Sequence, residues 1–170
     1  MINSDAIQVS IDIAVDPATA FEVFTQDMDV WWKKDRRYRF NWNKPIGTMR
    51  LEPRLAGRVM EVYDDGSHYY VGKILVWEPP QRLVFEWRSP NYRQDQVTEV
   101  EVQFKAIDTG TRASIEHRGW QHIPADHPAR HQTKDWDFIF LWGGMWRDHL
   151  QALQTISERF QGDHIRHNKM

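Results

Sequence analysis

The sequence predicts an α+β fold in which one antiparallel sheet is covered by a long C-terminal helix. Three observations support this prediction. Residues 8–15 alternate strictly between apolar and polar positions, as a half-buried strand does. Residues 48–119 form a run of strand-like segments separated by turn signals, with no helical pattern between them. Residues 135–160 place apolar side chains at helical spacing, so this helix is expected to cover the apolar face of the sheet.

The first elements are a strand and two short helices. The strand is QVSIDIAV (8–15), in which every second residue is apolar. A helix follows in DPATAFEVFT, because Asp16 is a suitable N-cap and Pro17 suits the first helical position. We expect a second short helix over residues 27–33. Residues 34–47 mix charged, aromatic, Pro and Gly residues without a period, and we interpret them as a loop.

Six strands are expected to continue the sheet, at residues 48–53, 58–63, 68–77, 82–88, 97–107 and 111–119. The turn signals DDG and DTG each separate two of these strands. Alternation within the strands predicts which residues lie on the covered, concave face: Tyr70, Gly72, Ile74, Leu83, Phe85, Trp87, Val100, Val102, Phe104, Ile115 and His117. By the same alternation, Glu99 and Glu101 are expected to face water.

The helix predicted over residues 135–160 has one apolar face, formed by Ile139, Trp142, Trp146, His149, Leu150, Leu153, Ile156 and Phe160. Gly143 and Gly144 cost about 1 kcal/mol each relative to Ala, so the helix is expected to kink or to begin there. Residues 161–170 are expected to form a frayed tail. Because we find no internal repeat, low-complexity tract or linker, we interpret residues 1–170 as a single domain with a core at about 7–160.

Composition argues against several classes of function. The net charge of −2 gives no electrostatic reason to expect nucleic acid or a membrane surface as a partner. The chain has no cysteine, which excludes disulfides and thiolate chemistry. No apolar run approaches the length of about 20 residues that a bilayer requires, and the N-terminus lacks a signal-peptide pattern, so we expect a cytoplasmic protein. The nine tryptophans either fill a mixed core or line a surface that meets a ligand.

Several motifs together resemble a known family. They are DPATAFEVFT at 16–25, WW at 31–32, GR followed by Glu at 57–61, VGKILVWEPPQRLVFEW at 71–87 and EHRGW at 116–120. Over about 7–160 the chain resembles the bacterial single-domain homologues of the heat-shock-protein-90 ATPase activator C-terminal domain (AHSA-type), in the START/Bet v-like SRPBCC superfamily. This subgroup often has a glycine pair where the chain has Ala56 and Gly57, a departure that affects only a turn.

The resemblance implies a helix-grip fold with an internal cavity between the sheet and the last helix. Superfamily members bind lipids, hormones or polyketides, catalyse cyclisations, or assist a chaperone in the stress response, so the fold does not decide the activity. Our leading hypothesis is the binding of a small hydrophobic or aromatic molecule in the cavity, with no cofactor. The alternatives are a co-chaperone-like interaction module and a cyclase- or hydrolase-type enzyme that uses His117. We expect a monomer or a homodimer.

Three polar side chains are candidates for the cavity. His117 shares the covered face of its strand with apolar residues, where it is either a hydrogen-bonded core imidazole or a ligand contact, and burial would lower its pKa. Glu61 pairs with His117 if it points inward and is a surface charge if it points outward. His149 lies on the apolar stripe of the last helix, either as a neighbour of that stripe or as a ligand contact.

Four aromatic residues flank the loop at 34–47 or lie within it: Trp31, Trp32, Phe40 and Trp42. They form either a flap over the mouth of the cavity or packing against the edge of the sheet. The arginines of RRYR (36–39) lie near the same mouth and either receive an acidic group of a ligand or solvate the loop.

The predicted ligand-binding set is His117, Glu61, Tyr70, Phe85, Trp87, Phe104, Trp142, Trp146, His149, Trp31 and Trp42. His122, His127 and His131 gather in a polar loop, and we predict no metal site there. The signatures of nucleophile elbows, phosphate-binding loops and zinc proteases are absent from the sequence.

Overall fold

The computed structural model describes residues 6–127 and 135–167, and their side chains except at 135–139 and 162–167. The strands are β1 (Ala6–Ile13), β2 (Thr48–Leu51), β3 (Arg58–Val62), β4 (His68–Glu78), β5 (Arg82–Trp87), β6 (Thr98–Ile107) and β7 (Gly110–Arg118). They form one seven-stranded antiparallel sheet with the order β1-β7-β6-β5-β4-β3-β2. The chain therefore meanders from β2 to β7, and β7 then pairs with β1.

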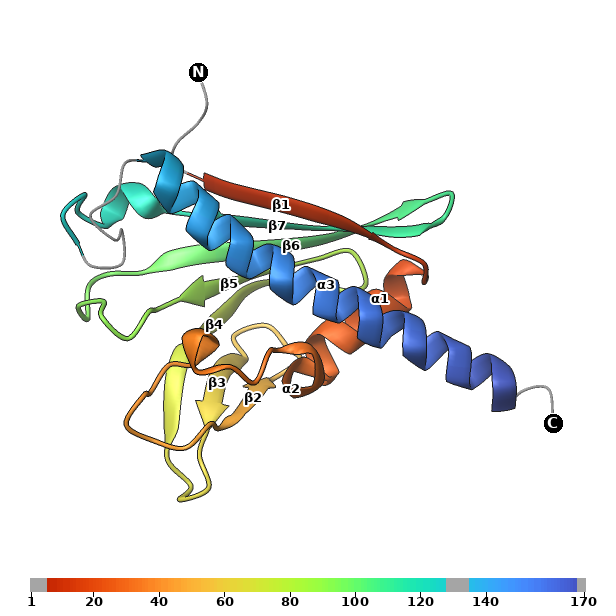
Figure 1. The fold of residues 1–170 in the computed structure, drawn as a ribbon, viewed down its shortest axis with the longest axis horizontal. Coiled ribbons are helices and arrows are strands. Elements are labelled where there is room, and N and C mark those ends of the chain that lie inside the picture. Colours follow the sequence, from red (N-terminus) through yellow and green to blue (C-terminus); the bar gives the residue numbers. More distant parts are fainter. Residues whose placement is uncertain (1–5, 128–134, 168–170) are drawn as a thin grey trace.

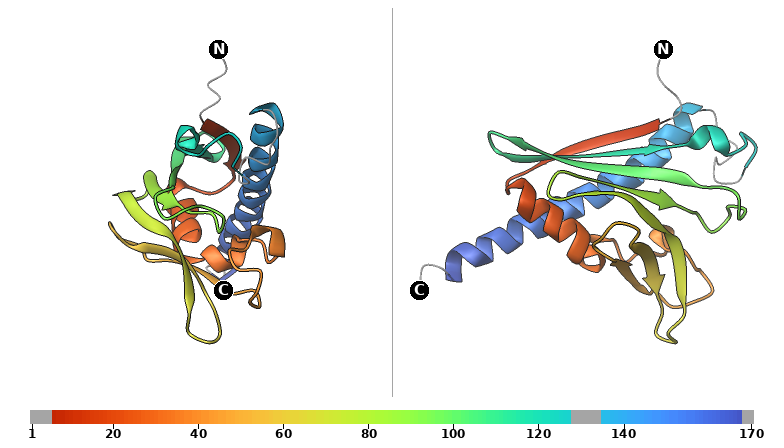
Figure 2. Two further views of the ribbon diagram at one scale, coloured as in Figure 1. Left: turned by 90° about the vertical axis from the view of Figure 1, so that its left-hand side faces the viewer. Right: turned by 180° about the vertical axis from the view of Figure 1, so that it is seen from behind.

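The helices are α1 (Pro17–Gln26), α2 (Met28–Trp31) and α3 (Asp135–His167), with 3-10 turns η1 (Arg36–Tyr38) and η2 (Trp120–His122). α3 crosses one face of the sheet diagonally (Figure 1). The views in Figure 2 show the same two layers, with α1 and α2 beside α3 on the covered face. This arrangement confirms the predicted α+β helix-grip fold.

The local sequence explains where the first helices begin and end. Asp16 caps α1, because its Oδ1 accepts a hydrogen bond from the Thr19 backbone N–H at 2.9 Å, and Pro17 occupies the first helical position. α2 is shorter than the helix predicted over 27–33. It ends at Trp31 because the backbone becomes extended at Trp32, which turns both indoles into the core.

Two register irregularities bend β4, and they overturn the predicted orientation of Tyr70. Tyr70 was expected on the covered face, but it is exposed on the other one, where its ring lies under the Arg88 guanidinium. Tyr69 and Val71 point inward instead. The pairing of β4 shifts once against β3 and once against β5, so simple alternation does not hold along this strand.

α3 is continuous through Gly143 and Gly144 and neither kinks nor begins there as the sequence suggested. Trp146, Leu150 and Leu153 are fully buried beneath it, as the apolar stripe predicts. The helix also continues to His167, so most of the segment expected to be frayed is helical. Once a helix has formed, adding residues to its end costs little.

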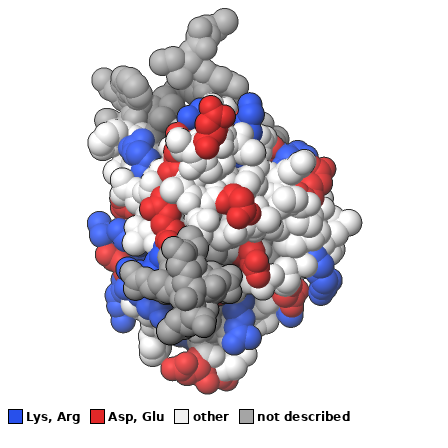
Figure 3. All heavy atoms as spheres, turned by 90° about the vertical axis from the view of Figure 1, so that its right-hand side faces the viewer, with Lys and Arg blue, Asp and Glu red and all other residues white. Residues whose placement is uncertain are grey.

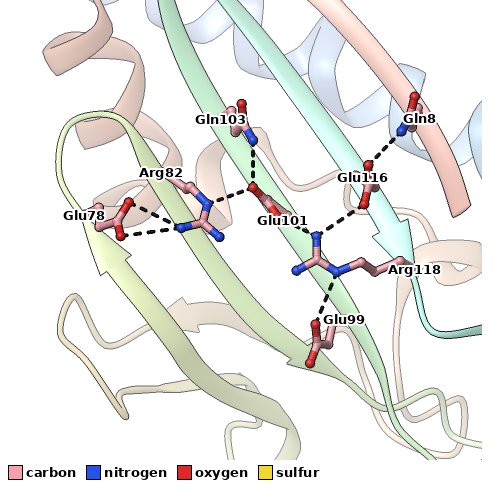
Figure 4. A network of polar contacts seen from close by, with 8 residues as sticks. All are labelled: Gln8, Glu78, Arg82, Glu99, Glu101, Gln103, Glu116 and Arg118. Atoms are coloured by element: carbon pink, nitrogen blue, oxygen red, sulfur yellow. Dashed lines mark hydrogen bonds and ion pairs between the residues drawn. The ribbon is translucent and has the colours of Figure 1, made fainter.

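The outer face of the sheet carries a network of ion pairs (Figure 4). Glu101 lies at its centre and accepts hydrogen bonds from Arg82 Nε at 2.7 Å, from Gln103 and from Arg118. It faces outward as predicted, but these neighbours cover it. Although burial raises the pKa of Glu101, the hydrogen bonds from Arg118 and Arg82 lower it to about 2.

The end of the molecule seen in Figure 3 shows acidic and basic side chains interspersed, and neither sign covers this face. None of the helices, taken over the residues that the structure describes, is long and apolar enough to cross a membrane.

Candidate functional site

His117 lies on the covered face of β7, as the alternation predicts, and it is completely buried. The Trp146 indole Nε1–H donates to His117 Nδ1 at 3.2 Å, and Nε2 lies 2.8 Å from Thr98 Oγ1. Because an indole can only donate, Nδ1 must accept, so the proton is on Nε2 and is donated to Thr98. The Thr98 hydroxyl in turn donates to the Trp87 carbonyl at 3.4 Å.

These contacts leave the His117 imidazole neutral and without a free lone pair. Burial lowers its pKa to about 3. Three tryptophans pack around the ring besides Trp146: Trp87, Trp120 and Trp142, with ring centroids 5.6, 4.5 and 5.2 Å away. Gly119, with φ +94°, turns the chain after β7, and the Trp120 indole donates back to the His117 carbonyl at 3.1 Å.

His149 of α3 is also fully buried, and its ring packs at a tilt of 31° against Trp32, with centroids 4.1 Å apart. Its Nδ1 lies 3.0 Å from the Met145 carbonyl oxygen and must therefore carry the proton that it donates there. Nε2 has no hydrogen-bond partner among the described residues. Burial lowers the pKa of His149 to about 3, so this ring is neutral as well.

Glu61 of β3 points inward and is fully buried, but its hydrogen-bond partners are two backbone groups of the loop after η1 and the Tyr63 hydroxyl, not His117. Oε2 accepts from the Phe40 backbone N–H at 2.9 Å and from the Tyr63 hydroxyl at 3.2 Å. Oε1 accepts from the Gly47 backbone N–H at 3.0 Å. Glu61 therefore anchors both ends of the segment from Phe40 to Gly47.

A pocket of about 710 Å³ opens between this loop, the end of β5 and the first half of α3. Its described lining comprises Trp32, Arg37, Tyr38, Arg39, Phe40, Asn41, Trp42, Asn43, Trp87, Ser89, Pro90, Asn91, Leu141, Trp142 and Met145. The volume lies in the range typical of sites for small organic molecules. Aromatic rings supply much of the wall, and no carboxylate is present among these residues.

The structure brings three of the predicted ligand-binding residues together in this pocket: Trp42, Trp87 and Trp142. Other members of the predicted set lie in the core and not in the described lining: His117, Glu61, Phe85, Phe104, Trp146, His149 and Trp31. The two histidines are nevertheless close to it. His117 contacts Trp87 and Trp142, and His149 contacts Trp32, so both lie one layer of side chains behind the pocket wall.

The aromatic residues around the loop divide between the two roles that the sequence left open. Trp31, Trp32 and Phe40 are buried in the core, although Trp32 and Phe40 also present part of their surface to the pocket. Trp42 is 70% exposed at the pocket and its indole donates to the Arg39 carbonyl at 3.2 Å. Trp42 is therefore the one residue of these four that is exposed at the pocket.

Several pocket residues were not singled out from the sequence, notably Ser89, Asn91 and Met145. Ser89 and Asn91 belong to the turn SPNYRQD, which alternation cannot orient. Met145 follows Gly143 and Gly144, at the point where the sequence left the course of the helix uncertain. The described residues contain no group of three His, Cys, Asp or Glu side chains that could hold a metal ion, and His131 lies outside them.

Comparison with solved structures shows where this fold recurs. Protein MLL2253 from Mesorhizobium loti matches with a TM-score of 0.64 and 17% identity, over 91% of this chain and 97% of that one. The Aha1 dimer from Colwellia psychrerythraea matches with a TM-score of 0.61 and 15% identity, over 90% and 96%. The anthrahydroquino-gamma-pyrone synthase Txn09, complexed with SUM, matches with a TM-score of 0.53 and 24% identity, over 91% and 99%.

At these identities the likeness shows a shared fold. No curated protein matches the chain. The family model described as "Activator of Hsp90 ATPase homolog 1-like protein" matches residues 14–155, which confirms the resemblance seen in the sequence motifs. This family and its fold support a ligand-binding or co-chaperone-like domain. The chain belongs to the Activator of Hsp90 ATPase homolog 1-like family.

Proposed function

We propose that this protein binds a small aromatic or hydrophobic molecule in the pocket between the loop at 37–43, the end of β5 and α3. The observation that carries the proposal is the lining itself. Trp32, Trp42, Trp87 and Trp142 face a volume of about 710 Å³ together with Tyr38 and Phe40. Such a wall removes a ligand's apolar surface from water and offers ring faces and edges for stacking.

The free energy gained by burying the apolar surface of a ligand is adequate for reversible binding. A planar ligand of two fused rings that buries about 150–250 Å² of apolar surface gains about 4–6 kcal/mol. Part of this gain is lost to the cost of association, so we expect dissociation constants in the micromolar to millimolar range for a simple probe. Txn09 supports the proposal, because a protein of the same fold is described as complexed with SUM.

Binding fits the geometry better than catalysis by His117 does. A general base needs a free lone pair within reach of the substrate. His117 uses both ring nitrogens in hydrogen bonds to Trp146 and Thr98, and it lies behind Trp87 and Trp142. Glu61, the partner considered for it, is engaged by the loop instead.

Binding of N-phenyl-1-naphthylamine, whose fluorescence rises when it leaves water, tests this proposal. We expect saturable binding to the wild-type protein. Trp42→Ala should weaken it about fivefold to tenfold, because a large exposed ring of the pocket is removed. Tyr70→Thr is the matched control, because Tyr70 is an exposed aromatic residue outside the described lining. Absence of binding, or equal losses in both variants, would contradict the proposal.

A co-chaperone role is the second candidate, and the family description favours it. Phe140 and Leu141 of α3 are 70% and 50% exposed, which gives a partner protein apolar surface at the rim of the pocket, where Leu141 belongs to the lining. Under this alternative, the protein would change the ATPase rate of an Hsp90-type chaperone, and Phe140→Ser, at an exposed residue outside the described lining, would reduce the change. A cytoplasmic location belongs to either proposal.

A further inference from the structure

The two edge strands of the sheet differ in length and in how their free edges are covered. β2 has only four residues, and its Met49 backbone N–H already donates to Asp29 Oδ1 of α2 at 2.9 Å. β1 has eight residues and lies at the opposite rim of the sheet, as Figures 1 and 2 show. An edge strand with unpaired N–H and C=O groups is a template for another strand, so the cover over β1 decides whether it can bind one.

Hydrogen bonds from α3 show which backbone groups of β1 point away from β7. The Asp12 carbonyl accepts from Gln154 Nε2 at 2.8 Å, and the Ala14 N–H donates to a carboxylate of the same helix at 3.0 Å. Successive residues of a strand direct their backbone groups to opposite sides. Because β1 and β7 pair in one unbroken register, Gln8 and Ser10 direct their N–H and C=O groups to the same side as Asp12.

α3 therefore covers the end of the β1 edge and leaves its first half open. The backbone N–H and C=O groups of Gln8 and Ser10 have no hydrogen-bond partner on this side among the described residues, and both residues are exposed. Natural edge strands commonly carry a lysine, a proline or an inward-pointing charge that prevents pairing with another chain. Residues 6–11, with the sequence AIQVSI, contain none of these.

This open segment is complementary to a second copy of itself. When two copies lie antiparallel with Val9 opposite the partner's Val9, Gln8 lies opposite the partner's Ser10. These two residues exchange two backbone hydrogen bonds, and the symmetric pair exchanges two more. On the covered face, Ile7 lies opposite the partner's Ile11, and β-branched side chains pack well on a pleated surface.

Charge and topology favour a second copy over another occupant. In this register Asp12, which is already paired with Arg112, lies opposite the partner's Ala6, so no like charges face each other across the two strands. The hydrogen bond from Gln154 to the Asp12 carbonyl is kept, because the central pairs use only Gln8 and Ser10. Since each copy contributes the same edge, the interface closes at two subunits.

We propose that this protein forms a symmetric homodimer in which the β1 strands of two copies pair antiparallel around Val9, so that one sheet runs through both subunits. The inference goes beyond the proposed function and does not depend on it, because Gln8 and Ser10 lie outside the described lining of the aromatic pocket. A contact made by one pair of strands is small, so the dimer dissociates on dilution.

Sedimentation velocity over a wide range of protein concentrations tests the interface. The wild-type protein should change from monomer to dimer as its concentration rises. Ser10→Pro removes an N–H that points away from β7, so it blocks the free edge while the hydrogen bonds between β1 and β7 remain, and this variant should stay monomeric. Ser10→Thr keeps the N–H and is the matched control, which should dimerise as the wild-type protein does. Circular dichroism and the thermal midpoint verify that each variant folds.

Cysteine cross-linking tests the register without a proline variant, because the chain has no cysteine of its own. In a mixture of Gln8→Cys and Ser10→Cys proteins, the two cysteines lie directly opposite each other, with Cα atoms about 5.5 Å apart, which suits a disulfide. In either variant alone the cysteines are diagonal neighbours, about 7–8 Å apart. Oxidation should therefore link the mixture about tenfold faster than either variant alone.

Three results would overturn the proposal. A wild-type protein that stays monomeric at every concentration would leave the edge to a strand of another protein. A dimer that persists in Ser10→Pro would have its interface elsewhere on the molecule. Equal rates of cross-linking in the mixture and in the single variants would contradict the register around Val9. None of these results bears on binding of N-phenyl-1-naphthylamine, so the two proposals fail separately.

Discussion

The residues behind the pocket wall include two neutral histidines, and their protonation makes stability depend on pH. Burial lowers the pKa of His117 and of His149 to about 3, against about 6.5 in an unfolded chain. Between these values the unfolded chain binds protons that the folded chain does not. The free energy of unfolding should therefore fall as the pH drops below about 6.5, by up to about 1.4 kcal/mol per pH unit for each histidine.

Urea unfolding at several pH values between 7.5 and 5 measures this slope. His117→Gln should reduce it, even though the substitution also lowers stability at all pH values. His122→Gln is the control, because His122 is exposed and its replacement should leave the slope unchanged. A free energy of unfolding that stays constant over this range would show that the histidines are not buried as described.

Glu61 gives the second prediction at the scale of single residues. Glu61→Gln replaces one carboxylate oxygen with a donor, which cannot accept from the backbone N–H of Phe40 or of Gly47, and it removes the larger of the two carboxylate charges that act on Arg39. We expect a loss of about 2–3 kcal/mol in the free energy of unfolding. Asp95→Asn, which removes one member of an exposed ion pair with Arg93, should cost less than about 0.5 kcal/mol. Similar losses for both would contradict the anchoring role.

The sequence predicted the face on which His117 lies but not its partners. Strand alternation is a local property, and it places a side chain on one side of a sheet. The choice between a core imidazole and a ligand contact depends on Trp146 and Thr98, which come from α3 and β6. The distinct burial of Arg39 among the arginines of RRYR depends in the same way on Gly47 at the end of the loop and on Glu61 of β3.

At the scale of elements, replacing two glycines by alanine should change the free energy of unfolding in opposite directions. Gly144 lies within α3, where an added Cβ would meet nothing nearer than the flexible end of Arg147 at 4.0 Å. Gly144→Ala should therefore raise the free energy of unfolding by about 0.5–1 kcal/mol. At Gly47 an added Cβ would lie 2.5 Å from the Val62 carbonyl oxygen and 2.8 Å from Glu61 Cγ.

Gly47→Ala should accordingly lower the free energy of unfolding by about 2 kcal/mol and weaken N-phenyl-1-naphthylamine binding, because the loop at 37–43 loses its anchor. Denaturant unfolding of both variants beside the wild-type protein tests the pair. The account of the loop would be wrong if Gly47→Ala were as stable as the wild-type protein and bound the probe equally well.

Side-chain orientations were predictable in strands that alternate regularly, and they were not predictable where the backbone is irregular. β6 alternates without interruption, so Thr98, Val100 and Val102 lie on the covered face as expected. β4 carries two register shifts that are not apparent in the sequence HYYVGKILVWE. The predicted orientation of Tyr70 was therefore wrong. The continuity of α3 through Gly143 and Gly144 depends on packing of the helix against the sheet, which helix propensity alone omits.

For the whole molecule, the fold follows from the order of elements, whereas the pocket does not. A meander of strands ending in one amphipathic helix permits few layer arrangements, so the helix-grip fold was predictable. The pocket walls come largely from the loop after η1 and the turn after β5. These segments have no repeating backbone conformation, so the sequence pattern does not predict where their side chains point. The tryptophans could be expected in such a site by composition, but only the structure separates those of the pocket from those of the core.

Nuclear magnetic resonance of the indole N–H groups tests the central claim most directly, because the nine tryptophans are distributed over the molecule. In 15N-labelled protein titrated with N-phenyl-1-naphthylamine, signals assigned by Trp→Phe variants should move most for Trp42, Trp87 and Trp142, which line the pocket. Trp77, which packs on Phe21 outside the described lining, should not move. Shifts at Trp77 with none at the pocket tryptophans would contradict the assignment of this pocket as the binding site.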